Sequence, residues 1–280
     1  MRESIRSVLF LGLAIVAGCG ESFSEETAGP SSGFNLTFED EFEGAAGSPP
    51  DLSKWAFDIG TGTNGWGNNE LQNYTGRPDN VSLDGNGNLV ITARREDFAE
   101  SGFTSGRIKT QGLFEQRYGR FEARMRLPGP GAGLWPAFWM LGSEFGDESS
   151  NVPWPFVGEI DVMENIGDEE TIYGTVHGPG YSGGDSIGRR LVTPGEDYTA
   201  DFHVYRVDWD PSSIRWYVDG DLYFTLQVGD TPGDWVFDTP FFMILNLAVG
   251  GSFPGSPTDA TPFPAELVVD WVRVYERNPG

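Results

Sequence analysis

Three carboxylates lie within one short apolar run of this chain. Residues 158–165 read Gly-Glu-Ile-Asp-Val-Met-Glu-Asn. Ile160, Val162 and Met163 are typical of a buried strand, where an ionised side chain is costly unless it is paired or takes part in chemistry. A solvated strand would not need three acids among such residues. The run is therefore the first candidate for a reactive site, and a purely structural origin is the alternative.

The spacing of the acids indicates which chemistry they could perform. In a regular strand Glu159 and Asp161 share a face and Glu164 points the other way, because side chains alternate with a period of two. One extra residue, a β-bulge, would bring Glu164 onto the same face. Two glutamates facing one groove are the equipment for retaining glycoside hydrolysis. One carboxylate attacks the sugar, and the other protonates the leaving oxygen and later activates water.

The run Glu-Ile-Asp-Val-Met-Glu resembles the active-site strand of glycoside hydrolase family 16, in its bulged, laminarinase-like form. Further segments are similar to family segments and follow the family's order: Trp-Gly-Asn-Asn-Glu-Leu-Gln at 66–72, Gly-Leu-Trp-Pro-Ala-Phe-Trp-Met-Leu at 133–141, Gly-Thr-Val-His-Gly-Pro-Gly at 174–180, Asn-Leu-Ala-Val-Gly-Gly at 246–251 and Val-Asp-Trp-Val-Arg-Val-Tyr at 269–275. The resemblance covers roughly residues 34–277.

This resemblance implies a role for each acid. Glu159 would be the nucleophile and Glu164 the acid/base, while Asp161 would hydrogen-bond Glu159 and hold the charge balance between the two. Such a pair needs one ionised and one protonated carboxyl group, and close carboxylates achieve this by mutual repulsion. Retention of configuration also implies carboxyl groups roughly 5 to 5.5 Å apart.

Aromatic and polar residues in the family-like segments are candidates for sugar binding. Flat aromatic faces stack on the C–H surfaces of pyranose rings, although large aromatic side chains also dominate core packing. The resemblance implies substrate contact at the positions that match the family's cleft: Trp135, Trp139, Trp66, His177, Asn68, Glu70, Arg107 and Asn246. The alternative is that the polar residues satisfy loop backbone. By contrast, Trp209, Trp216 and Trp271 are expected in the core.

One position departs from the family. Phe253, in Gly-Gly-Ser-Phe-Pro-Gly, stands where many laminarinase-like members have tryptophan. Phenylalanine preserves a stacking face but loses the indole N–H donor. The departure therefore bears on affinity at that side of the cleft and not on catalysis.

The body of the chain predicts an all-β fold. Short β-rich runs recur between turns of Gly, Pro, Asn and Asp, and 39 Gly and 19 Pro suit one large β domain. Strands are expected at 89–94, 119–126, 202–209, 213–218, 221–226 and 241–246. Asp219-Gly220 is a two-residue hairpin signal. This pattern favours two packed antiparallel sheets, and the resemblance narrows it to a β-jelly-roll sandwich with a concave substrate cleft.

The N-terminal segment predicts export and anchoring. Residues 1–18 carry Arg2 and Arg6 before a short apolar stretch, as a signal peptide does. Val-Ala-Gly-Cys at 16–19 resembles the lipobox of bacterial lipoproteins, in which Cys19 becomes the lipidated first residue; an ordinary cleavage site beside an unremarkable cysteine is the alternative. Residues 19–33 would be the lipidated cysteine with a flexible tether, and 34–277 the catalytic domain. The expected location is extracytoplasmic, on a bacterial membrane through a lipid anchor.

Charge and ligand types exclude several function classes. The formal net charge of -24 argues against nucleic acid as a partner, because phosphates need Lys and Arg, and it disfavours sulfated galactans. A neutral polysaccharide such as a β-glucan fits better. Two His and one Cys give no zinc-like ligand set, so no cofactor is expected for catalysis. The protein is expected to be a monomer.

The resemblance also implies a structural calcium ion away from the cleft. Family 16 folds often bind one through two backbone carbonyls and an aspartate, and the matching positions are Glu41, Gly87 and Asp270. Calcium takes six to eight oxygen ligands, which carbonyls, a carboxylate and waters supply. The alternative is that Asp270 caps or pairs locally.

The function that these features favour is a retaining endo-β-glucanase that cuts β-1,3 bonds in laminarin-like glucans and mixed β-1,3/1,4-glucans. Another family 16 specificity, such as agarase or transglycosylase, is the alternative among enzymes. A surface glycan-binding lipoprotein without turnover is the alternative from a different class. The intact set of Glu159, Asp161 and Glu164 speaks against it, since a pure binder has no need of all three.

Overall fold

β-strands make up nearly all the regular structure of the computed structural model, which describes residues 33–147 and 149–278. Two short helical turns, η1 (Gly65–Asn69) and η2 (Gly183–Asp185), interrupt the described strands. The strands are β1 (Phe34–Asp40), β2 (Ala56–Phe57), β3 (Gln72–Tyr74), β4 (Val81–Leu83), β5 (Leu89–Phe98), β6 (Ser101–Ser105), β7 (Arg107–Lys109), β8 (Gly119–Arg126), β9 (Leu134–Gly142), β10 (Glu159–Glu164), β11 (Thr171–His177), β12 (Ile187–Val192), β13 (His203–Asp210), β14 (Ser213–Val218), β15 (Asp221–Gln227), β16 (Phe241–Val249) and β17 (Ala265–Arg277).

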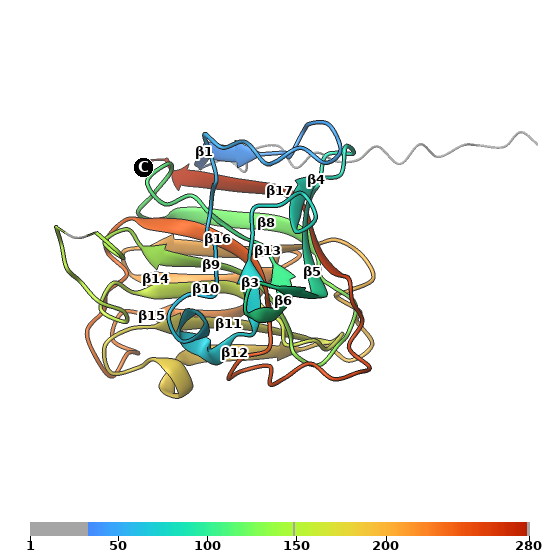
Figure 1. Ribbon diagram of the computed structural model, residues 1–280. Coiled ribbons are helices and arrows are strands. Elements are labelled where there is room, and N and C mark those ends of the chain that lie inside the picture. The colour runs from blue at the N-terminus through green and yellow to red at the C-terminus, as the bar shows by residue number, and fades with distance from the viewer. Residues whose placement is uncertain (1–32, 148, 279–280) are drawn as a thin grey trace, which may run out of the picture.

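The described strands form a ten-stranded and a seven-stranded sheet, stacked as two layers in Figure 1. The path through the ten-stranded sheet is β15-β14-β13-β8-β17-β5-β6-β3, with β1 beside β17 and β4 beside β5. The seven-stranded sheet runs β12-β11-β10-β9-β16-β7-β2. Among the described pairs β3 and β6 run parallel and the others antiparallel. The predicted sandwich of two antiparallel sheets is confirmed.

The burial pattern of each strand shows how the sheets share one core. In β8 every second residue is buried and the others are partly exposed, because this strand has one face on the core and one toward solvent. All nine residues of β16 are buried, so this strand is covered on both faces. Side chains of both sheets meet in one cluster that contains Trp55, Trp209 and Trp216, and the latter two are in the core as predicted.

A bulge in β17 makes the core prediction for Trp271 wrong. The register of β17 against β8 shifts between Val269 and Trp271, and this reverses the alternation of side chains beyond that point. Val272 and Val274 are therefore buried, while Trp271 is only half-buried. The guanidinium of Arg273 covers its ring at 4.3 Å from the centroid.

Local turn chemistry follows the sequence closely after β14, which has the predicted bounds. Asp219 and Gly220 are the two central residues of the hairpin between β14 and β15, and both have positive φ, 50° and 89°. These values are those of a type I′ turn, which Asp-Gly favours. This turn fixes the pairing of β14 with β15, the strand at one edge of the ten-stranded sheet.

Several N-terminal predictions concern residues that the structure does not describe. The signal segment, Cys19 and nearly all of the tether lie outside the described residues, and what was predicted for them stays a prediction. Across 33–147 and 149–278, no helix has the length and apolar character needed to cross a bilayer.

Candidate active site

Strand β10 carries the three acids and contains the predicted bulge. Its register against both neighbours, β9 and β11, shifts after Asp161, so part of β10 has no counterpart across the sheet. An extra residue reverses the alternation of side chains beyond it. Glu164 therefore faces the same side of the sheet as Glu159 and Asp161, and the predicted bulge is confirmed.

His177, on β11, lies against two of the acids. Its Nε2 is 3.3 Å from Asp161 Oδ2 and 3.5 Å from Glu159 Oε1. The side chains of His177, Glu159 and Asp161 are 14%, 15% and 5% exposed. Charges withdrawn from water to this degree are screened little by salt, so each protonation state in the cluster depends on the others.

Each glutamate also accepts a hydrogen bond from an indole. Trp135 Nε1 donates to Glu164 Oε1 at 2.8 Å, and Trp154 Nε1 donates to Glu159 Oε2 at 2.9 Å. Trp154 lies in the loop between β9 and β10, and its ring is 5.8 Å from that of His177. Sequence reasoning missed Trp154. The available signal was the Pro-Trp-Pro run at 153–155, just before the acidic strand.

Burial and mutual repulsion raise the pKa of both glutamates. Loss of hydration is the larger cause for Glu159 and the charge of Asp161 the next, and they raise its pKa to about 7. The same two causes hold the pKa of Glu164 well above its usual value. The charge of His177 opposes this rise for both glutamates, and His177 Nε2 lies 3.5 Å from Glu159 Oε1. Since the sites interact, the protons leave in two steps that belong to the pair.

The proton on His177 Nε2 faces the acids. The backbone N–H of Gly183 donates to Nδ1 at 3.0 Å, so the neutral ring carries its proton on Nε2. Burial lowers the pKa of His177, but the hydrogen bond to Asp161 and the charge of Glu159 outweigh it and raise the pKa to about 9. The Gly183 contact opposes this rise, because Nδ1 cannot accept and hold a proton together. In either form Nε2 donates toward Asp161.

This proton also decides whether the cluster suits a metal. Within the described residues, one group of side chains could offer ligands to a metal ion. It consists of Glu159, Asp161 and His177, whose ligand atoms all lie within 4.8 Å of one another. A metal on Nε2 would move the ring proton to Nδ1, where it would face the N–H of Gly183. The arrangement therefore suits proton transfer better than metal binding.

A second group of predicted residues lies beside the acids. The guanidinium of Arg107 lies over the rings of Trp66 and Trp139, at 4.6 and 4.8 Å from their centroids. Trp139 Nε1 donates to Asn246 Oδ1 at 2.7 Å. Because Trp139 also pairs with Asp161 across the sheet, this group is continuous with the acid cluster.

A hydrogen-bond network extends the second group to Glu70. Asn246 Nδ2 donates to the hydroxyl of Tyr74 at 3.2 Å, and that hydroxyl donates to Glu70 at 3.1 Å. Glu70 also accepts from Gln72 at 2.6 Å and from Asn68 at 3.4 Å. Loss of hydration is the main cause that raises the pKa of Glu70. Sequence reasoning missed Gln72 and Tyr74, although 70, 72 and 74 share one side of an extended segment.

Phe253 continues the aromatic surface next to Glu164. It is 43% exposed and makes edge contacts with Trp135 and Tyr173, with ring centroids 5.8 and 5.0 Å apart. Tyr173 pairs with Glu164 across the strands. The predicted apolar face at this position is therefore present near the acid.

The residues predicted to hold calcium lie together on the ten-stranded sheet. The Cβ position of Gly87 is 3.8 Å from the carbonyl oxygen of Glu41, and the register of β1 and β5 against β17 brings Asp270 to the same place. Carbonyls and one carboxylate suit calcium, so the donor set fits. Arg124 Nη1 lies 2.5 Å from Asp270 Oδ2, and a bound cation would compete with that ion pair.

A separate hollow of about 300 Å³ lies on the ten-stranded sheet and is lined by Phe34, Tyr118 and Arg215 among others. Two of its carboxylates, Asp208 and Asp210, are paired with arginines. They differ in this from the acids of β10, which lie beside other acids.

Comparison with known proteins agrees with this geometry. The sequence model described as "Glycosyl hydrolases family 16" matches residues 68–273. The chain belongs to this family. It is therefore a glycoside hydrolase by descent, and the acids of β10 lie inside the matched segment.

Relatives of the family 16 chain are similar over nearly its whole length. The beta-glucanase of Rhodothermus marinus is 40% identical over 286 residues, which is 98% of this chain and 96% of the relative. The laminarinase catalytic domain of Thermotoga maritima superposes with a TM-score of 0.81 at 43% identity, over 88% of this chain and 100% of that one. The endo-beta-1,3-glucanase of Pyrococcus furiosus gives 0.81 at 47% identity, over 88% and 96%.

Proposed function

We propose that this family 16 chain is a retaining endo-β-glucanase that hydrolyses β-1,3 bonds in laminarin-like glucans and in mixed β-1,3/1,4-glucans. The observation that carries the proposal is the bulge in β10, which sets Glu159 and Glu164 on one face. Each glutamate accepts a hydrogen bond from an indole, and burial with the charge of Asp161 raises the pKa of both, to about 7 for Glu159.

In the first step Glu159 acts as the ionised nucleophile. Its carboxylate oxygen forms a bond to the anomeric carbon while the glycosidic C–O bond breaks, and the proton of Glu164 passes to the leaving oxygen. The product is a glycosyl ester on Glu159. Trp154 and His177 donate toward Glu159 and its neighbour Asp161, and they hold the carboxylate in place for attack.

In the second step Glu164 acts as a base. Its carboxylate takes a proton from water, the water oxygen bonds to the anomeric carbon, and the ester bond to Glu159 breaks. Glu164 is again protonated and Glu159 again ionised. Two displacements at one carbon leave the product with the configuration of the substrate.

The substrate class rests on charge and on the named relatives. A chain of net charge -24 suits an uncharged polymer, and the similar proteins are named beta-glucanase, laminarinase and endo-beta-1,3-glucanase. Trp66, Trp139 and Phe253 supply flat faces for pyranose rings beside the acids. Asn68, Glu70 and Asn246 would contact sugar hydroxyls.

A side-by-side assay on laminarin, lichenan and agarose tests the substrate, with linkage analysis of the products. We expect reducing ends from laminarin and lichenan, none from agarose, and none from any polymer with a Glu159→Gln control. Release from agarose alone would assign another family 16 specificity. Binding of laminarin without any release would make the chain a glycan-binding protein, and transfer to added oligosaccharide in place of hydrolysis would make it a transglycosylase.

We also propose that the protein is a monomer anchored outside the cytoplasm of a bacterium by lipid on Cys19. The support is the lipobox-like Val-Ala-Gly-Cys at 16–19, and several acyl chains are needed for stable anchoring. Expressed in a bacterium, the full chain should incorporate labelled fatty acid and sediment with membranes, whereas Cys19→Ser should do neither. Unlabelled protein that retains residue 1 would contradict this.

A structural calcium ion is the last part of the proposal, held by the carbonyls of Glu41 and Gly87 and the carboxylate of Asp270. It would join β1, the turn before β5, and β17, and it would stabilise the folded state by mass action. Chelator should lower the melting temperature and added calcium restore it, while Asp270→Asn should weaken the response. A melting temperature indifferent to chelator would refute the site.

A further inference from the structure

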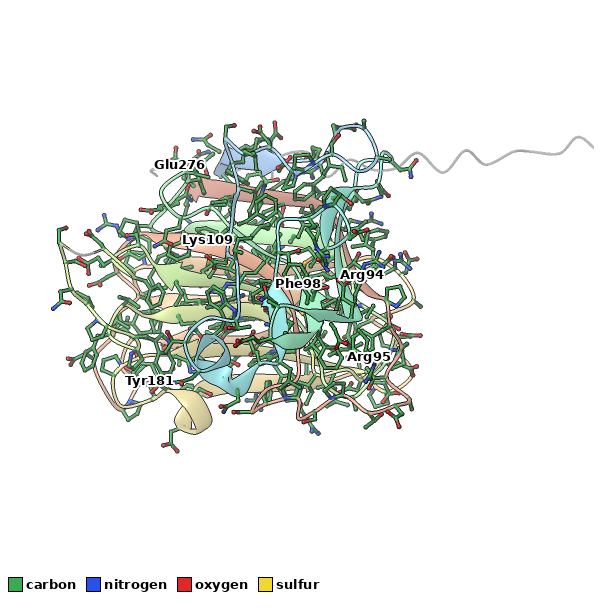
Figure 2. All side chains as sticks on the ribbon, in the orientation of Figure 1. Arg94, Arg95, Phe98, Lys109, Tyr181 and Glu276 are labelled. Carbon is green, nitrogen blue, oxygen red and sulfur yellow. The ribbon has the colours of Figure 1, made fainter. Side chains whose placement is uncertain are left out.

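Asp58 is a buried acid with a role beyond the residues already assigned. It follows β2 at the edge of the seven-stranded sheet, where its N–H donates to the carbonyl of Arg107 at 3.0 Å. Its Oδ2 lies 2.9 Å from Arg107 Nε, and its Oδ1 lies 2.7 Å from Lys109 Nζ. The side chain of Asp58 is 11% exposed. Figure 2 labels Lys109, the partner on the other carboxylate oxygen.

The Arg107 side chain that Asp58 holds contacts two indoles. Its guanidinium carbon lies over the rings of both Trp66 and Trp139. A planar guanidinium stacks on an aromatic face in a way that an ammonium group does not. The Asp58 carboxylate is an ion-pair partner of Arg107 at Nε, and this charge holds the guanidinium beside both indoles.

The backbone that carries Trp66 needs such a support. Asn64, Gly65, Trp66 and Gly67 have φ values of 52°, 58°, 55° and 85°, and a left-handed backbone is unfavourable for a bulky residue such as tryptophan. Strained residues of this kind persist only where the surroundings over-determine them. The Trp66 ring contacts the Arg107 guanidinium and the ring of Tyr74 at 5.6 Å, its Nε1 donates to the carbonyl of Gly60 at 3.3 Å, and it packs against Gly62.

We infer that Asp58 is a positioning residue for substrate binding: it orients Arg107 so that Trp66 and Trp139 are held as two fixed aromatic surfaces for glucan beside the acids. This inference rests on the proposed function for its substrate. Asp58 touches neither the acids nor their indoles, so its loss weakens binding and leaves the chemical step intact. Rigid aromatic surfaces bind better because less ordering is required when the sugar arrives.

Steady-state kinetics of Asp58→Asn on laminarin test the inference. The amide keeps the size of the side chain but removes the charge that holds Arg107. We expect KM to rise about tenfold with kcat within about twofold, the pattern of a lost binding contact. Near-ultraviolet circular dichroism should change as well, because two indoles lose their fixed surroundings. A KM within about twofold of the wild-type value, with an unchanged spectrum, would overturn the inference.

Lys109→Gln is the matched control. It removes the other partner of the same carboxylate but does not touch Trp66 or Trp139. We expect both KM and the spectrum to stay at the wild-type values. An increase in KM equal to that of Asp58→Asn would show that loss of any charge partner has the same effect, and it would overturn the positioning role.

Two further comparisons keep the inference testable if the Asp58→Asn variant misfolds or if the proposed substrate is wrong. If Asp58→Asn does not fold, Arg107→Lys takes its place, since lysine pairs with Asp58 but cannot stack on the two rings, and the same rise in KM is expected. If wild-type protein does not cut laminarin, the proposed function fails. The spectral comparison of Asp58→Asn with Lys109→Gln still supports or overturns the fixing of the indoles, because it requires no turnover.

Discussion

The carboxylates at the end of β13 and those of β10 stand in opposite surroundings. On the ten-stranded sheet, acids lie beside arginines: Asp208 pairs with Arg120 at 2.8 Å and Asp210 with Arg215 at 2.8 Å. On β10 of the seven-stranded sheet, acids lie beside acids. A carboxylate therefore holds strands together in one place and stands in a cluster suited to proton exchange in the other.

The electrostatic consequence is visible in two carboxyl groups. Burial acts against the ionised form of Asp210, but hydrogen bonds from Ser212 and Arg215 lower its pKa to about 2. Burial and the charge of Asp161 raise the pKa of Glu159 to about 7. The partner of an acid therefore decides its role in this molecule. An arginine fixes the charge of the acid, whereas a second acid makes that charge adjustable.

The largest expected effect comes from removal of a reactive acid. Glu159→Ala and Glu164→Ala should each lower kcat on laminarin at least about a thousandfold, because each removes a group that acts on the reacting atoms. Azide should partly restore Glu159→Ala and give a glycosyl azide of inverted configuration. Asp210→Asn is the control and should keep wild-type kcat. Near-normal turnover by Glu159→Ala would contradict the assignment of Glu159 as the nucleophile.

Asp161→Asn should have an intermediate effect and sharpen the comparison by removing a like charge. Glu159 must be ionised to attack, so kcat/KM should rise with pH through its pKa of about 7 in the wild type. With residue 161 neutral, the pKa of Glu159 falls and this rise moves to lower pH. We expect kcat to fall by about ten- to a hundredfold as well. If kcat/KM of Asp161→Asn rose with pH at the same pH as in the wild type, this would contradict the repulsion between Asp161 and Glu159.

The smallest expected effect concerns stability on the other sheet. A lowered pKa means that the ionised Asp210 carboxylate, held by Ser212 and Arg215, stabilises the fold above the unfolded-state pKa of 3.8, and that this contribution is lost as pH falls through about 2. Asp210→Asn should therefore cost at most about 1 kcal/mol in the free energy of unfolding near neutral pH, because the pair is partly solvated. Chemical denaturation at pH 7 and pH 2 measures this. A difference between the two proteins that persists at pH 2 would be inconsistent with an ionic origin.

Local patterns in the sequence predicted much of the fold. Alternation of apolar residues placed β8 and β14 with their observed bounds, and Asp219-Gly220 placed the turn between β14 and β15. The bulge in β10 was predicted because three acids on one face had a chemical reason. The bulge in β17 had no such signal, and for that reason Trp271 was wrongly placed in the core.

Contacts made across space account for what the sequence did not predict. Trp154 reaches Glu159 from a loop, and Asp58 reaches Arg107 from a neighbouring strand, so neither shows a periodic signal. The raised pKa values of the glutamates likewise depend on burial by residues that the fold brings together. Residue types near the acids were predictable from sequence, but their partners required the fold.

The configuration of the first product tests the central claim most directly. Laminarin or a laminari-oligosaccharide is cut in an NMR tube, and the anomeric proton of the new reducing end is observed before mutarotation. Attack by Glu159, with Glu164 as acid and then base, predicts that the β-anomer appears first and the α-anomer follows slowly. Initial release of the α-anomer would mean a single displacement by water, and it would contradict the assignment of Glu159 as nucleophile.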